Sequence, residues 1–312
     1  MQHFWLPEAL TQVAKDSDSL FYIILAITLF FFVLVELLLA VFLVRYRRKW
    51  AAKEGLNLHG NHRLEIIWTA IPALILVVLG VYSTQMTYAI QKTPSDVVVI
   101  NVTGQKWSWE YEYPGGFKKT NDLRLPEGKD VLFKITSKDV IHSFWIPEFR
   151  MKQDAVPGRE TQYSVKVEGQ SKNENLRVVC AEYCGTAHTM MVNKITIMKA
   201  DEFDAWVKSG GKAGASTGGA LDGKTVAQEN GCLNCHSVDG GQGVGPTWKG
   251  LAGSDRKLAD GSTVKADDAY LTESIFKPGD KLAEGYGNVM QPYSSMSEEE
   301  AKALVEFIKT LK

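Results

Sequence analysis

Two long apolar runs constrain most strongly what this chain can fold into. Residues 20–44 contain a single charged side chain, Glu36, and residues 66–90 contain none. As a helix, each run is about 37 Å long, which exceeds the roughly 30 Å thickness of a bilayer's hydrocarbon core. A cleaved secretory signal would instead have a basic segment, a shorter apolar core and a small-residue cleavage site. The sequence therefore predicts two membrane-spanning helices, over about 20–44 and 66–90, within an N-terminal segment 1–94.

The loop between the two runs is rich in lysine and arginine. Loops on the cytoplasmic side of a membrane carry an excess of these residues. We therefore expect this loop in the cytoplasm, and both termini with all later domains on the outer face. The basic residues are Arg45, Arg47, Arg48, Lys49, Lys53 and Arg63.

Residues 95–207 have the pattern of a β domain. Short β-branched and aromatic runs alternate there with Pro- and Gly-containing turns, which is typical of an antiparallel sandwich or barrel. The predicted strands are 97–103, 107–113, 131–136, 161–167, 176–179 and 192–198. The sequence therefore predicts a second domain, built from β-strands, over these residues.

The last third of the chain consists of a linker and a helical domain. Residues 208–220 are Gly, Ala, Ser, Thr and Lys, which predicts a flexible linker. In residues 221–312, Ser297 and Glu300 form a capping box before an apolar helical stripe. A net charge of -1 and a hydrophobic content of 45% argue against both a nucleic-acid-binding and a disordered protein.

The second of two cysteine pairs predicts covalent haem. Cys232-Leu-Asn-Cys235-His236 is a C-x-x-C-H sequence, in which two thiols bind the haem vinyl groups and the histidine binds the iron. A chance pair, a redox dithiol and half of a zinc site are the other readings, but this region has neither the context of a redox dithiol nor enough further ligands for zinc. The domain resembles small class I cytochromes c, which are all-α. Met290 is the expected sixth ligand, with Met296 as the alternative.

The first cysteine pair has further metal ligands close to it in sequence. Cys180 and Cys184 are followed by His188 and Met191. Two cysteines at this spacing alone would also fit a disulfide or a copper-delivery dithiol. Thiolate, imidazole and thioether groups together are soft ligands that suit copper, and two cysteines can bridge two copper ions. The pattern therefore favours a binuclear copper centre.

This stretch resembles subunit II of haem–copper cytochrome c oxidases. The resemblance extends to Asp139-Val-Ile-His142-Ser-Phe-Trp145, to the aromatic segment 104–113, and to segments 155–159 and 65–72. Together with the C-terminal haem domain, it indicates the caa type, which has a fused cytochrome c. The resemblance implies a cupredoxin-like β-barrel at 95–207 and a cytochrome c domain at 221–312. It also places the chain in a bacterial plasma membrane.

The resemblance also implies a set of copper ligands. Two thiolates would bridge both coppers of a CuA centre, and one imidazole with a further donor would complete each copper. The family's H-x-x-M spacing selects Met191 rather than Met190. The implied ligands are Cys180, Cys184, His142 with Met191, and His188 with the backbone carbonyl of Glu182.

Three further residues receive roles from the resemblance. The Glu182 carboxylate would face a Mg²⁺ or Mn²⁺ site shared with subunit I. Trp107 would be the aromatic residue through which electrons enter the copper centre, although a Trp-x-Trp strand is also typical of a core. Glu65 would lie at the mouth of a proton pathway, although an acid at a helix start is also favoured by the helix dipole.

The implied function is electron input to a proton-pumping terminal oxidase. Electrons would pass from cytochrome c or another donor through haem c and CuA to subunit I, which reduces dioxygen, so this chain holds no catalytic residue. Subunit I and subunit III are the implied partners. Two alternatives remain open: a membrane-anchored copper-delivery or thiol-redox protein with a fused cytochrome, and the CuA module of a nitrogen-oxide reductase.

Overall fold

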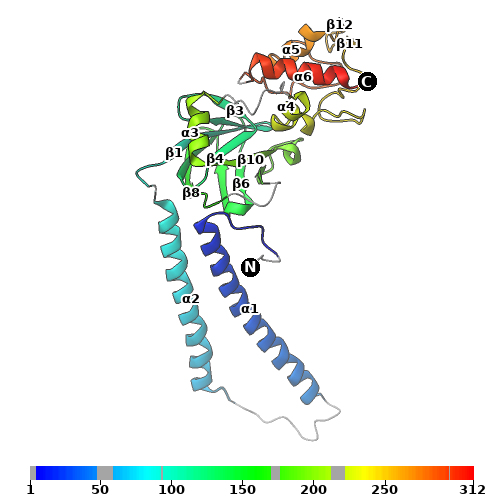
Figure 1. Cartoon of the computed structure of the whole chain (residues 1–312). Helices are drawn as coiled ribbons and strands as arrows, with labels where there is room; N and C mark the ends of the chain where they lie inside the picture. The colour runs from blue at the N-terminus through cyan, green and yellow to red at the C-terminus, as the bar shows by residue number, and fades with distance from the viewer. Residues whose placement is uncertain (1–4, 48–58, 93, 170–175, 212–221, 295) are drawn as a thin grey trace. The chain divides into compact units, whose positions relative to one another are not determined.

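The computed structural model describes residues 5–47, 59–92, 94–169, 176–211, 222–294 and 296–312 (Figure 1). These residues form two compact units. One unit contains residues 15–92, and the other contains residues 1–14 together with 93–312. The two predicted apolar runs lie in the first unit, and the predicted β and haem domains lie in the second.

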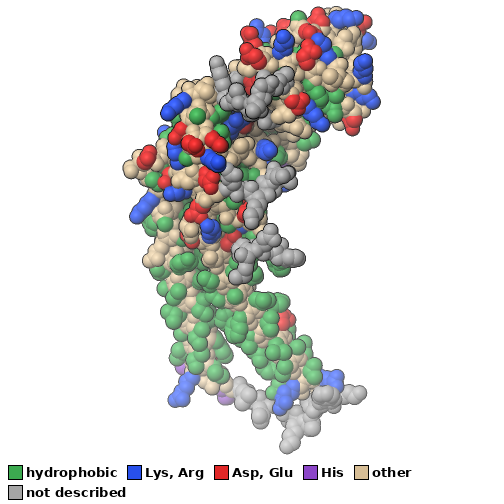
Figure 2. All heavy atoms as spheres, viewed as in Figure 1, with side chains coloured by type: hydrophobic (Ala, Val, Ile, Leu, Met, Phe, Trp, Pro, Cys, Tyr) green, Lys and Arg blue, Asp and Glu red, His purple; other side chains and the backbone are tan. Residues whose placement is uncertain are grey.

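Two long helices form the unit 15–92. They are α1, Gln12–Arg45, and α2, His62–Gln91, and both are long and apolar enough to cross a membrane. Hydrophobic side chains cover the outside of both helices (Figure 2). Such exposed apolar surface is stable in lipid, where each helix satisfies its own backbone hydrogen bonds. Both predicted spans thus lie in long apolar helices, and both helices extend beyond the predicted apolar runs.

The start of α2 is capped by a polar side chain. The Asn61 side-chain oxygen accepts hydrogen bonds from the backbone N–H groups of Arg63 and Leu64, which satisfies two donors that have no partner within the helix. Because the cap lies at Asn61 rather than near Ile66, Pro72 is inside the helix and not near its start.

The β domain consists of two five-stranded sheets. The order of strands is β3-β2-β1-β5-β8 in the first sheet and β4-β10-β9-β6-β7 in the second. The first sheet contains β1 (Val98–Gln105), β2 (Ser108–Glu112), β3 (Lys118–Thr120), β5 (Asp130–Ser137) and β8 (Thr161–Lys166). The second contains β4 (Asp122–Pro126), β6 (His142–Ile146), β7 (Met151–Ala155), β9 (Arg177–Cys180) and β10 (Val192–Met198).

Both sheets are mixed rather than purely antiparallel. The pairs β1–β5 and β4–β10 are parallel. The chain leaves the first sheet at β4 and returns to it at β5, so β5 joins β1 in the same direction after a crossover. The cupredoxin-like β architecture is confirmed, whereas the expectation of a wholly antiparallel domain is wrong.

The core lies between the two sheets and combines aliphatic side chains with several large aromatic ones. Trp109, Tyr111, Phe133 and Phe144 are fully buried in it. Trp109 and Tyr111 lie on the same face of β2 because successive side chains of a strand point to opposite faces. The Tyr111 hydroxyl donates to the Asn193 side chain at 2.8 Å, so this buried polar group is satisfied.

A short helix, α3 (Ala200–Lys208), packs on the β domain through aromatic rings. Phe203 and Trp206 are buried on its inner face. The Trp206 ring lies edge-on against Tyr113 and Phe117, at centroid distances of 4.7 and 5.2 Å. This aromatic cluster holds α3 against the sheets of the β domain.

The C-terminal domain is mainly helical. It contains α4 (Gly223–Glu229), the single-turn 3-10 helix η3 (Cys232–Asn234), α5 (Asp268–Phe276) and α6 (Glu298–Thr310). The predicted capping box is present at the start of α6, and the apolar stripe that follows it is buried. Most of the predicted linker 208–220 lies outside the described residues, and Lys208 belongs to α3.

The C-terminal domain also contains one small antiparallel pair, so it is not wholly α-helical. Strand β11 (Asp255–Lys257) pairs with β12 (Thr263–Lys265). Between them, the Asp260 carboxylate accepts hydrogen bonds from the Ser262 backbone N–H and hydroxyl, and Gly261 has φ of +85°. An Asp-Gly pair favours such tight turns, which explains the hairpin.

Candidate functional sites

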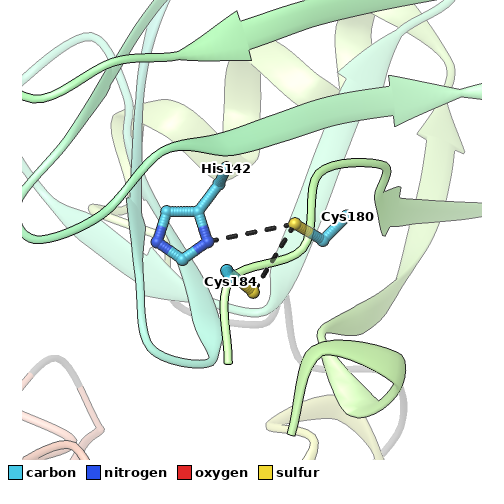
Figure 3. Close-up of side chains that lie close together, drawn as sticks. All are labelled: His142, Cys180 and Cys184. Carbon is cyan, nitrogen blue, oxygen red and sulfur yellow. Dashed lines mark hydrogen bonds between the residues drawn. The ribbon is translucent and has the colours of Figure 1, made fainter. Parts of the chain in front are cut away.

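Two thiols and an imidazole converge at one end of the second sheet. His142 begins β6, Cys180 ends β9, and Cys184 lies in the loop that follows β9. The Cys180 sulfur is 3.9 Å from His142 Nδ1 and 3.8 Å from the Cys184 sulfur (Figure 3). All three side chains are buried, and their ligand atoms lie within 4.8 Å of one another.

The remaining predicted copper ligands reach the same two sulfurs. Cys184 Sγ lies 3.5 Å from His188 Nδ1 and 3.8 Å from Met191 Sδ. Cys180 Sγ lies 3.2 Å from the Glu182 backbone carbonyl oxygen. The structure therefore brings together all six of the predicted donor groups, from β6, from β9 and from the loop that precedes β10.

The donor set and its spacing fit a copper centre. A disulfide requires sulfurs about 2.05 Å apart, whereas the sulfurs of Cys180 and Cys184 are separated by 3.8 Å. A metal–thiolate bond is roughly 2.3 Å long, so one ion can contact both sulfurs at this separation. Two thiols with imidazole and thioether groups beside them form a soft donor set of the kind that copper prefers.

The two thiols have unequal proton affinities. Burial raises the pKa of Cys180, but its contacts with His142 and with backbone N–H groups outweigh burial and lower this pKa to about 7. Burial and the adjacent charge of Cys180 raise the pKa of Cys184. One thiolate therefore forms readily near neutral pH, whereas the second forms only when a cation compensates the second negative charge.

Asp139 orients the buried imidazole of His142, and it was not predicted as a site residue. Its carboxylate accepts a hydrogen bond from His142 Nε2 at 2.8 Å and another from the Lys106 backbone N–H at 2.8 Å. With its proton on Nε2, His142 presents the Nδ1 lone pair to the thiols. The sequence does indicate this residue, since Asp139 lies three residues before His142 in the motif Asp-Val-Ile-His.

The residues predicted for electron entry and cation binding lie beside the thiols. Trp107 Nε1 donates a hydrogen bond to the Cys184 backbone carbonyl at 3.3 Å. The side chain of Glu182 is exposed, although its carbonyl faces Cys180. Glu65 belongs to the other unit, in the first turn of α2, where its carboxylate lies 3.1 Å from His62 Nδ1.

The C-x-x-C-H residues lie at the edge of a pocket in the C-terminal domain. His236 Nδ1 donates to the Pro246 carbonyl at 2.7 Å, which leaves Nε2 to bind a metal. The His236 ring also stacks on Trp248 at a centroid distance of 5.0 Å. Gly245 is required here because a Cβ atom would lie 2.6 Å from the His236 ring. The Pro246 carbonyl and the Trp248 ring thus hold the histidine in place, and Trp248 was not predicted as a site residue.

The pocket has the residues that covalent haem needs. Cys232, Cys235 and His236 line it together with Met290 and Met296, and most of its other lining residues are apolar. Burial raises the pKa of Cys232 to about 12, which argues against an activated redox thiol. Met296 is almost fully buried and Met290 is partly exposed, so both remain placed to be an axial ligand.

Comparisons with known proteins give one consistent result. The family model of the transmembrane domain of cytochrome c oxidase subunit II matches residues 1–86, that of its periplasmic domain matches residues 116–198, and that of cytochrome c matches residues 220–312.

Individual relatives carry the same description. Cytochrome c oxidase subunit 2 of Alkalihalophilus pseudofirmus is 34% identical over 285 residues, which cover 87% of this chain and 80% of that protein. The Bacillus subtilis subunit 2 is 30% identical, over 86% and 81%. The solved periplasmic domain of subunit II from Bradyrhizobium japonicum is 30% identical and covers 39% of this chain and 98% of that one, with a TM-score of 0.36.

Proposed function

Since the chain belongs to the cytochrome c oxidase subunit II family, in the form with a C-terminal cytochrome c domain, we propose how its residues hold the two redox centres of an electron-input subunit. When bound, copper and haem c accept and donate the electrons that the subunit delivers to the haem–copper centre of subunit I. The chain is thus an oxidase subunit in the membrane, with subunit I as its partner, and dioxygen is reduced outside it.

Six groups of the β domain hold a binuclear CuA centre. Cys180 and Cys184 would contribute two thiolates, and His142 and His188 would each contribute Nδ1. The Met191 thioether and the Glu182 carbonyl would supply the remaining two donors. The proposal is supported by the convergence of these donors within 3.9 Å of the two sulfurs. Asp139 keeps the proton of His142 on Nε2, so that Nδ1 can bind metal.

Four groups of the C-terminal domain hold haem c. Cys232 and Cys235 would form the thioether links, His236 would bind the iron through Nε2, and Met290 would be the sixth ligand. The hydrogen bond from His236 Nδ1 to Pro246 supports this role because it fixes the ring orientation. With both axial positions filled by protein, the site transfers electrons and leaves no open position for a substrate.

The observation that carries the proposal is the meeting of both thiols with His142, His188 and Met191. A copper-delivery or thiol-redox protein would require neither His188 nor Met191. We expect the purified chain to contain two coppers and one low-spin haem c, with an electron paramagnetic resonance signal in which one unpaired electron is shared by both coppers. One copper per chain, or a reducible disulfide between Cys180 and Cys184, would contradict the CuA proposal.

Two residues connect the copper site to its surroundings. We assign electron entry to Trp107, because its indole is hydrogen-bonded to the backbone of the ligand Cys184. The exposed Glu182 carboxylate would bind a Mg²⁺ or Mn²⁺ ion shared with subunit I. Manganese resonance spectra of the assembled oxidase with Glu182→Gln test the second assignment, since the bound Mn²⁺ signal should be lost.

The orientation in the membrane and the remaining partners are also proposals. The basic loop between α1 and α2 favours a cytoplasmic loop, with both termini and both redox domains on the outer face of a bacterial plasma membrane. Glu65, at the loop end of α2, would then lie on the cytoplasmic side, as a proton-pathway entrance requires. Subunit III is a further partner, and cytochrome c or another outer-face protein is the donor.

A further inference from the structure

Side-chain amides on the haem-binding loops reach the backbone beside copper-ligand residues. Asn234 lies between the two haem-attachment cysteines. Its Nδ2 group donates to the Met190 carbonyl at 3.0 Å and to the Val192 carbonyl at 3.1 Å. These carbonyls flank Met191 on both sides, so one amide spans the backbone of a proposed copper ligand with both of its N–H groups.

A second amide makes the matching contact at the other haem-binding loop. Gln291 directly follows Met290, and its Nε2 donates to the Lys106 carbonyl at 2.8 Å. Lys106 directly precedes Trp107, the proposed entry residue. The residue that follows Met290 therefore makes a contact with the β domain.

The same interface includes a further amide and an ion pair. Asn121 Nδ2 donates to the Asn230 carbonyl at 3.4 Å, while Asn121 Oδ1 accepts from the Trp109 N–H at 2.9 Å. Lys119 Nζ lies 3.6 Å from Glu300 Oε1. Trp107 and Asn121 also line the pocket that contains the haem-attachment cysteines. The haem pocket thus borders directly on the proposed entry residue.

We propose that Asn234 and Gln291 are positioning residues that seat the haem domain on the CuA domain in one orientation. The inference rests on the proposed function of the two sites. Hydrogen bonds between amides and carbonyls are directional and carry no net charge. They fix the rotation of the haem domain about the interface, and salt screens them far less than it screens exposed charge pairs. Electron transfer between the two domains should therefore depend little on ionic strength.

A zero-length cross-link in the full-length chain measures this seating without relying on electron transfer. A carbodiimide should join Lys119 to Glu300, and mass spectrometry of digested protein quantifies the product. Mixing isotopically labelled with unlabelled chain separates links within one molecule from links between molecules. The double variant Asn234→Asp, Gln291→Glu keeps the side-chain sizes but removes the N–H donors and places carboxylates against carbonyl oxygens.

We expect this double variant to lose roughly tenfold or more of the intramolecular link, because three hydrogen bonds are lost and unfavourable contacts replace them. The matched control is Asn288→Asp with Gln242→Glu, which adds the same charge at exposed amides of the same domain. The control should cross-link like the unmodified chain. Equal yields from the double variant and the control, or a yield that collapses after a roughly tenfold rise in salt, would overturn the proposal.

Spectra of the same samples separate a positioning role from damage to either site. The haem absorption and the copper resonance signal should remain unchanged in the double variant, while photoinduced electron transfer from haem to copper slows. If the unmodified chain cross-links but lacks two coppers or haem c, the proposed function fails and the interface stands. If both centres are present and the double variant still cross-links normally, only the positioning role fails.

Discussion

At the scale of single residues, the two methionines of the haem pocket make distinguishable predictions. Met290→Leu should abolish the sulfur–iron charge-transfer band near the red end of the ferric spectrum, because leucine has no donor atom. Met296→Leu should keep the band and lose a fraction of the domain's stability, since Met296 is a buried core residue. The ferric absorption spectra of both variants are the measurement. Loss of the band in Met296→Leu instead would assign the ligand to Met296.

Residue chemistry made the site largely predictable. The soft donors of the first cysteine pair are close in sequence, and His142 lies in a recognisable motif, so the predicted donors do meet. Asp139 and Trp248 were missed because they act through histidines and not on metal directly. Asn234 and Gln291 were missed for another reason: their partners, Val192 and Lys106, are remote in sequence and are backbone carbonyls, which no residue pattern identifies.

At the scale of elements, the start of α6 offers a stability test. The Ser297 hydroxyl accepts from the Glu300 N–H at 3.1 Å, and the Glu300 carboxylate accepts from the Ser297 N–H at 2.8 Å. Ser297→Ala should lower the free energy of unfolding of the haem domain by about 1 kcal/mol. Ser294→Ala, at an exposed position of the preceding loop, is the matched control and should be nearly neutral. Denaturant titration followed by haem absorption measures both, and equal losses would contradict the capping role.

Long and strongly patterned elements were predictable, and short ones were not. The spans and most of the longer strands were identified, because periodicity and apolar composition accumulate over many residues. Strands β3, β4, β6 and β7 were missed. They have three to five residues, and their pairing depends on neighbours far along the chain. The missed β6 holds His142 beside Cys180, through the pairing of Phe144 with Cys180.

At the scale of the whole molecule, removing copper should affect one domain and spare the other. A ligand that binds only the native state adds stability that grows with its concentration relative to Kd, about 2.7 kcal/mol at a hundredfold excess. Copper-free protein should therefore show a lower Tm for the β domain, while the haem-reported transition keeps its Tm. Calorimetry with and without copper, with haem absorption recorded in parallel, measures this. An unchanged β-domain transition would contradict copper binding by its loops.

The aromatic cluster of α3 has a consequence for competition between electron donors. Trp206 of α3 packs against Tyr113 and Phe117. This contact fixes the start of the segment that leads from α3 to the haem domain. Only residues 209–221 separate α3 from Asp222, the N-cap of α4. A short tether of this kind gives an effective concentration on the order of millimolar. A soluble cytochrome at micromolar levels would rarely displace the resident haem domain from the copper site. Other electron donors would then be kept from the copper site because the haem domain occupies it. They would have to deliver their electrons to the tethered haem.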